Sequence, residues 1–122
     1  MSRDWLLYLD DLVQSAEKIC RYVDGLSFEE FCANEVIFDA VLFNLQVIGE
    51  ASKQLPDTAK VAVSEIEWSD PARFRDIIAH HYFALDPHII WDVAVHRVPE
   101  LLATARSLLA RFEQGGESGK QS

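Results

Sequence analysis

Side chains that could do chemistry are most concentrated between residues 73 and 82, which read Arg73-Phe74-Arg75-Asp76-Ile77-Ile78-Ala79-His80-His81-Tyr82. Arginine, histidine and tyrosine together suit the cleavage of a phosphodiester without a metal ion. A guanidinium binds phosphate through two hydrogen bonds and stabilises charge in the transition state. Histidine titrates near neutral pH and can move the proton of a ribose 2′-hydroxyl or of the leaving oxygen, and tyrosine can stack on a base. On spacing alone, a structural polar cluster is the more common explanation of such a set.

The helix predicted over residues 70–82 brings these side chains together only in part. Arg75 and Tyr82 share one face of it, and Asp76 lies one turn before His80. Asp76 can therefore orient His80 or stabilise its charged form. Arg75 and His80 point about 140° away from each other on a regular helix. A composite site needs a helix end near His80, or a second copy of the helix across a two-fold axis.

Helical periodicity dominates the rest of the chain. Apolar residues spaced three and four apart predict a helix over residues 5–23, with Ser2 as its cap and Gly25 at its end. A capping box over residues 27–30 opens a short helical turn. A long helix over residues 35–54, ended by a proline, carries apolar residues on more than one face. Such a helix is central in a bundle or faces a second subunit.

Aspartate–proline pairs mark the starts of the later helices. Residues 57–68 are mixed and predict a short helix and a loop, after which Asp70-Pro71 begins the helix that runs to about residue 82. Asp86-Pro87 begins a last helix that ends near Phe112, with a kink at Pro99. The predicted fold is all-α, an up-and-down bundle of four or five helices in a single domain, residues 1–112, followed by a disordered C-terminal tail, residues 113–122.

The charge balance limits the possible partners. The chain has 11 basic and 20 acidic residues and a formal net charge of −9, which excludes a broadly basic nucleic-acid coat. Any phosphate contact must come from a few focused arginines. No signal peptide or membrane span is apparent, and Cys20 and Cys32 fit small buried hydrophobes in a reducing compartment. These features predict a cytoplasmic protein.

Other polar and aromatic candidates have simpler explanations. His88, Asp92 and His96 recur every four residues, but they span two helical turns, too far for one metal ion, and predict a surface polar stripe. Glu50 is either solvated or paired with an arginine near the site. The tryptophans, which predict core or interface anchors rather than RNA stacking, are Trp5, Trp68 and Trp91. Neither a metal nor another cofactor is expected.

Several stretches resemble the HepT toxins, which belong to the HEPN superfamily of small helical RNases. Arg75-x4-His80-x-Tyr82 matches their R-x4-H-x-Y motif, and Trp68 stands seven residues before Arg75, as a family tryptophan does. Residues 44–51, NLQVIGEA, are similar to the long-helix signature of the family. The sequence HHYFALD followed by Ile90-Trp91 is similar to the segment that follows the motif. The resemblance covers nearly the whole chain.

The resemblance implies a homodimer whose motif helices face each other across a cleft. It implies an endoribonuclease toxin of a type VII toxin–antitoxin pair, with Arg75 and His80 as catalytic residues. Tyr82 would position RNA and receive AMP from an MntA-like nucleotidyltransferase, the antitoxin. Asp76 stands where the family usually has asparagine, and Arg73 lies where it has glycine. Arg73 adds positive charge beside the site and Asp76 subtracts some, so both are supporting residues.

A second interpretation stays open. Similar helical proteins are non-catalytic partners or substrate-binding subunits of small nucleotidyltransferases. The net charge of −9 favours this interpretation, because a chain with few cations binds RNA weakly. The intact set of Arg75, His80 and Tyr82 favours the nuclease.

Overall fold

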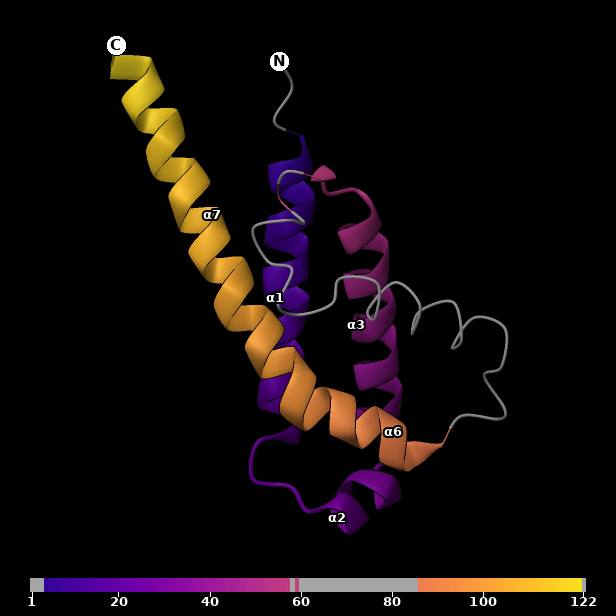
Figure 1. Ribbon diagram of the computed structural model, residues 1–122. Coiled ribbons are helices and arrows are strands. Elements are labelled where there is room, and N and C mark those ends of the chain that lie inside the picture. Colours follow the sequence, from indigo (N-terminus) through magenta and orange to yellow (C-terminus); the bar gives the residue numbers. More distant parts are fainter. Residues whose placement is uncertain (1–3, 58, 60–85, 122) are drawn as a thin grey trace.

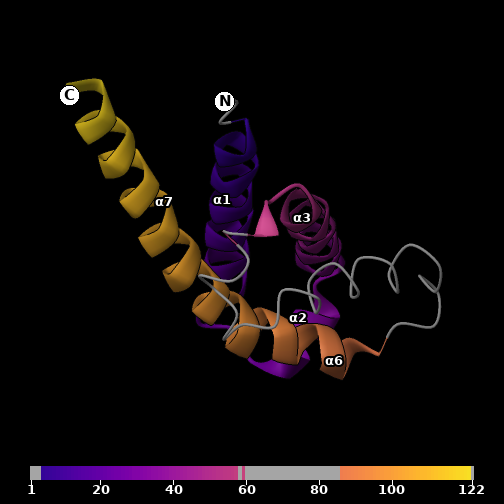
Figure 2. The same ribbon diagram turned by 45° about the horizontal axis from the view of Figure 1, so that its top comes forward.

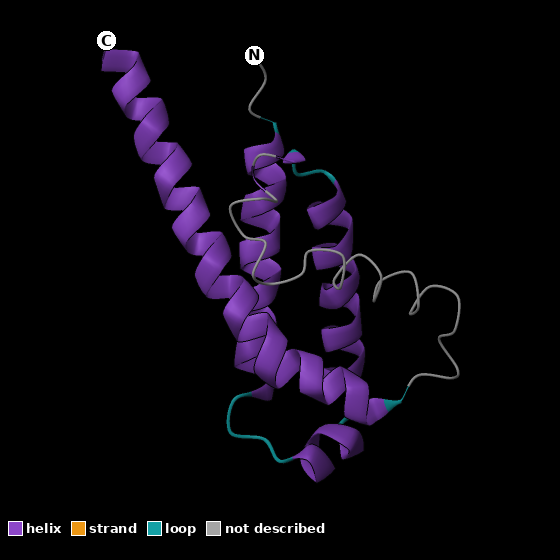
Figure 3. Cartoon of the chain, viewed as in Figure 1, coloured by secondary structure: helices purple, strands orange, loops and turns teal. Residues whose placement is uncertain are grey.

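The computed structural model describes residues 4–57, 59 and 86–121, and the surroundings of side chains as far as residue 112. Every regular element within these ranges is a helix (Figure 3). The first three are α1 (Trp5–Val23), α2 (Phe28–Ala33) and α3 (Glu35–Lys53). A second run consists of α6 (Pro87–Asp92), a π-helical segment (Val93–Arg97) and α7 (Val98–Gln121). The predicted all-α bundle is confirmed.

Helix α1 lies at the centre of the described bundle. It packs against α3 on one side and against α7 on the other (Figures 1 and 2). The short α2 lies at one end, next to the start of α6, while the two chain termini lie at the opposite end (Figure 1). Most of the core consists of aliphatic side chains from α1, α3 and α7, including Leu9, Leu12, Ile19, Val41, Ile48, Leu101 and Leu108. Complete burial of each such side chain contributes roughly 1.5–3 kcal/mol.

The first helix boundaries follow from local backbone chemistry. Gly25, predicted to end α1, has φ +76°, a left-handed conformation that is strained for any residue with a side chain. The predicted capping box is present, since the Ser27 hydroxyl accepts the Glu30 N–H at 3.1 Å and the Glu30 carboxylate accepts the Ser27 N–H at 2.9 Å. The N-cap of α1 is Asp4, so the predicted cap at Ser2 is wrong. The observed N-cap lies two positions after Ser2, and the helix begins at Trp5.

The predicted kink near Pro99 takes the form of a π-turn. Proline has no N–H, and its ring clashes with the carbonyl of the residue four positions before it, here Val95. The Val98 N–H bonds to the Val93 carbonyl five residues back, which widens the helix immediately before Pro99. The chain changes direction between α6 and α7 (Figure 1). The π-turn before Pro99 therefore separates α6, which contacts α2, from α7, which packs on α1.

Helix α7 is longer than the sequence predicts. It continues through Gln121, whereas a helix end near Phe112 and a disordered tail over residues 113–122 were expected. The glycines after residue 114 lower helix propensity by about 1 kcal/mol each, but no proline interrupts the helical hydrogen bonds there. Within the described ranges, no helix combines the length and apolarity needed to cross a membrane.

Candidate functional site

The residues predicted to carry the chemistry lie outside the described part of the chain. They are Arg73, Arg75, Asp76, His80 and Tyr82. The same holds for Trp68 and for the predicted helix over residues 70–82. Their roles and their mutual geometry therefore stay predictions. The structure defines instead the two flanks of this segment and the surfaces around them.

The two flanks enter the bundle at opposite ends. On one side, α3 ends at Lys53 at the same end of the bundle as the start of α1 (Figure 1), and Ala59 beyond it is completely buried. On the other side, the described chain resumes at Asp86, where α6 begins beside α2 (Figure 1). Both ends of the segment are therefore held by the fold, one through a buried alanine and one through a helix start.

Asp86 begins α6 in the way that the Asp86-Pro87 pair predicts. Its carboxylate accepts the backbone N–H of His88 at 2.9 Å and lies 3.2 Å from Nδ1 of the same histidine. The backbone hydrogen bond, followed by the bond to the His88 side chain, lowers the pKa of the Asp86 carboxyl group. Proline at the first helical position has no N–H to leave unsatisfied. Asp86 is therefore a charged cap at the exit of the predicted catalytic segment.

Aromatic rings join α2 to the first turns of α6. The His88 ring stacks on Phe28, with 4.2 Å between ring centroids and 27° between ring planes. Trp91 packs against Phe31 at 5.1 Å and against Phe28 at 6.2 Å. Phe31 is completely buried and the His88 side chain is exposed, so this aromatic cluster extends from the core to the surface. Trp91 is a packing anchor, as predicted, and so is Trp5, whose ring meets Phe112 edge-on at 4.9 Å.

The histidine–aspartate stripe of α6 and the π-turn is a surface feature, as predicted. His96 Nε2 lies 3.9 Å from Asp92 Oδ1, and these side chains are 70% and 63% exposed. His88 turns instead toward Asp86. In the described residues, no group of three histidines, cysteines or carboxylates could hold a metal ion.

A groove lies where α1 and α3 run side by side. It has a volume of about 470 Å³, and its walls include Tyr8, Asp11, Phe43, Val47 and Glu50. Glu50 is exposed here. The groove walls carry carboxylates but no lysine or arginine, so they are unsuited to phosphate.

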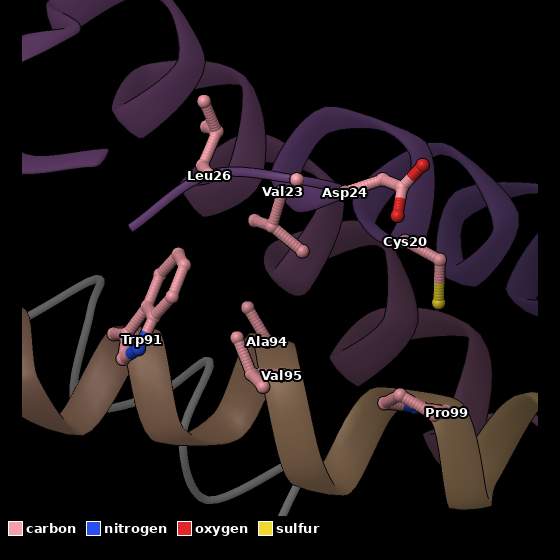
Figure 4. A pocket seen from close by; sticks show the side chains of 9 residues that line it. Cys20, Val23, Asp24, Leu26, Trp91, Ala94, Val95 and Pro99 are labelled. Atoms are coloured by element: carbon pink, nitrogen blue, oxygen red, sulfur yellow. The ribbon is translucent and has the colours of Figure 1, made fainter. Parts of the chain in front are cut away.

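A second groove, of about 320 Å³, lies between the end of α1 and the bend before α7 (Figure 4). Trp91, Val95 and Pro99 face Val23 and Leu26 across it. Cys20 lies at its edge, and burial raises the pKa of this thiol while the nearby Arg106 opposes the shift.

The prediction that both cysteines are buried is wrong for Cys32, which is exposed on α2, and Cys20 is only partly buried. Phe31, the neighbour of Cys32, is the only residue of the six-residue α2 that is buried. A short helix lying on the end of the bundle turns most of its residues to solvent, which leaves Cys32 outside the core.

Comparison with known proteins places the chain in a family. The family model described as "Ribonuclease HepT-like" matches residues 12–108. The chain belongs to the HepT-like ribonuclease family. The matched range includes the segment that contains Arg75, His80 and Tyr82, and it also includes the capped start of α6.

Individual relatives of this HepT-like protein agree with the family match. "Probable ribonuclease HepT" of Thermococcus cleftensis is 35% identical over 101 residues, which cover 83% of this chain and 92% of the relative. "Putative RNase MJ0127" of Methanocaldococcus jannaschii is 30% identical over 116 residues, covering 95% and 96% of the two chains. No solved structure matches the chain significantly.

Sequence reasoning missed the contact between Phe28 and His88. The two residues are far apart along the chain, and neither the capping box nor the histidine spacing links them. The only sequence signal was indirect, since Asp86-Pro87 predicted a helix start just before His88.

Proposed function

We propose that this HepT-like protein is a metal-independent endoribonuclease. The observation that carries the proposal is the family match across residues 12–108, a range that contains the motif Arg75-x4-His80-x-Tyr82. Arg75 binds the scissile phosphate and stabilises its transition-state charge. His80 acts as general acid or base on the 2′-hydroxyl or the leaving oxygen. Tyr82 positions the RNA, while Asp76 and Arg73 adjust the charge around the site.

The protein acts as the toxin of a type VII toxin–antitoxin pair in this proposal. An MntA-like nucleotidyltransferase is its antitoxin and transfers AMP from ATP to the Tyr82 hydroxyl, which loses its proton as pyrophosphate leaves. What supports this is the sequence resemblance to HepT toxins around residues 75–82. No cofactor is required for either binding or cleavage of RNA.

The distribution of charge restricts where RNA can approach. Between residues 4 and 57 the chain has eleven acidic and three basic residues. Helices α1, α2 and α3 therefore present an acidic surface, which repels a phosphate backbone. Residues 86–112 carry three acidic and three basic residues. Within the described ranges, RNA approach is therefore less disfavoured along the second helical run than along the acidic helices α1, α2 and α3.

A homodimer is part of the proposal, because Arg75 and His80 diverge on a regular helix. Helix α3 supports it with an apolar face that the described chain leaves open to solvent. Val36 is 78% exposed and Phe43, two turns further along, is 63% exposed. We expect a dimer whose interface includes the 70–82 helix, and sedimentation at micromolar concentration tests whether the protein is a dimer. A monomer under these conditions would remove the basis for a composite site.

RNA cleavage in EDTA is the direct test of the proposed activity. The purified protein is expected to cut RNA in the presence of the chelator, because its predicted catalytic groups are an arginine and a histidine. RNA that stays intact with and without added Mg²⁺ would contradict the nuclease.

The other candidate function is a non-catalytic partner or substrate-binding subunit of a small nucleotidyltransferase. The acidic surface of α1–α3 favours it, because most of the described chain is unsuited to RNA. The same cleavage assay separates the two functions, since a non-catalytic partner leaves RNA intact.

A further inference from the structure

One imidazole ring, that of His88, joins α2 to the start of α6. On one side it stacks on Phe28, with ring centroids 4.2 Å apart. On the other side its Nδ1 lies 3.2 Å from Oδ1 of Asp86, which also accepts the His88 backbone N–H at 2.9 Å. We refer to Phe28, Asp86 and His88 as the α2–α6 clamp. The clamp fixes the first turn of α6 relative to α2.

The α2 side of this clamp is itself held firmly. The capping box satisfies the backbone N–H groups of Ser27 and Glu30 at the start of α2. Phe31, one turn after Phe28, is completely buried and contacts Phe38 of α3 at 5.3 Å between ring centroids. Phe28 therefore lies on a helix that core packing holds in place.

The clamp contributes little to the core. The side chains of His88 and Asp86 are 76% and 54% exposed. Exposed charged contacts of this kind add little to global stability. Beyond the first turn of α6, Trp91 already packs against Phe31 of α2, with ring centroids 5.1 Å apart. The contacts of His88 with Phe28 and Asp86 are therefore not explained by a contribution to folding stability alone.

The position of Asp86 along the chain suggests what the clamp does. Asp86 follows Tyr82 by four residues and His80 by six. An extended chain spans at most about 3.6 Å per residue, so Tyr82 must lie within about 14 Å of Asp86 and His80 within about 22 Å. Fixing Asp86 therefore limits where the predicted catalytic histidine and tyrosine can lie.

We propose that the α2–α6 clamp positions the segment carrying His80 and Tyr82 for catalysis, with Phe28 and His88 as positioning residues. This inference rests on the proposed ribonuclease function. The physical reason is that small displacements of reacting groups cost rate much more than they cost stability, on the order of a hundredfold for 1 Å. A weak surface contact close to the site can therefore control turnover without being needed for folding.

The chain offers a matched control on the same helical run. His96 pairs with Asp92 at 3.9 Å, is exposed to a similar extent as His88, and has no aromatic ring stacked on it in the described structure. His88→Ala and His96→Ala thus remove the same side chain from similar surroundings. Only the first breaks the clamp.

The experiment measures RNA cleavage by the full-length protein and amide hydrogen exchange over residues 73–85. His88→Ala and Phe28→Ala are each expected to lower kcat roughly tenfold with little change in KM, because the reacting groups are misplaced while RNA still binds. Phe28→Tyr keeps the ring, so its kcat should stay close to that of the wild type. The double variant should lose no more than either single variant, since both remove one contact. His96→Ala should match the wild type.

Hydrogen exchange separates a failure of this inference from a failure of the proposed function. Exchange over residues 73–85 is expected to accelerate in His88→Ala and Phe28→Ala but not in His96→Ala. If the wild type cuts no RNA, the ribonuclease proposal fails and the exchange measurement alone decides the clamp. Equal kcat and equal exchange in His88→Ala and His96→Ala would overturn the inference. Loss of helical signal in both His88→Ala and Phe28→Ala would show a structural contact and overturn the inference as well.

Discussion

His80→Ala is expected to reduce RNA cleavage by about 10²- to 10⁴-fold, the contribution usual for a positioned general acid or base. Alanine removes the imidazole that moves the proton of the 2′-hydroxyl or of the leaving oxygen. RNA binding should change little, because Arg75 still provides the phosphate contact. Cleavage rates in EDTA and binding measured by fluorescence anisotropy check the two parts of this expectation.

The neighbouring His81 provides a matched control for His80. On a helix the two side chains point about 100° apart, so His81→Ala should retain most of the activity. The thermal midpoint of His80→Ala should stay within a few degrees of the wild type. Equal losses from both substitutions, or a loss of helical signal in His80→Ala, would instead identify a structural histidine.

The local part of the fold could be predicted from the sequence because its signals act over a few residues. The capping box before α2 and the aspartate that caps α6 satisfy backbone N–H groups within one turn, and the glycine that ends α1 supplies a left-handed conformation at a single residue. The bend near Pro99 belongs to the same class, since proline removes one specific hydrogen bond. Each of these predictions is confirmed.

The tertiary arrangement could be predicted only in part. Exposure of Cys32 depends on where α2 rests against α3 and α6, which no local pattern encodes. The stack of His88 on Phe28 likewise joins two helices that are far apart in sequence. The end of α7 was misjudged because glycine weakens a helix without ending it. The predicted site itself, residues 73–82, lies outside the described chain, so its geometry stays a prediction.

Tyr82→Phe is expected to leave the protein resistant to its antitoxin. In the predicted 70–82 helix, Tyr82 lies on the same face as Arg75, so a group on its hydroxyl projects into the space for the RNA phosphate. An adenylyl group adds bulk and a negative phosphate, which competes for Arg75 and repels the RNA backbone. One covalent bond could then block RNA binding without unfolding the bundle. Phenylalanine keeps the ring but removes the acceptor oxygen.

Intact-mass measurement after incubation with an MntA-like nucleotidyltransferase and ATP tests this switch. Mass increments of AMP are expected on the native chain and not on Tyr82→Phe, whose RNA cleavage should continue in the presence of the antitoxin. Tyr8→Phe is the matched control, because Tyr8 is 40% exposed on α1 and offers a second accessible hydroxyl. It should be modified and silenced like the wild type, since the site of transfer is selected by the surroundings of Tyr82 and not by exposure alone. Increments on the Tyr82→Phe chain, or on neither chain, would exclude Tyr82 as the acceptor.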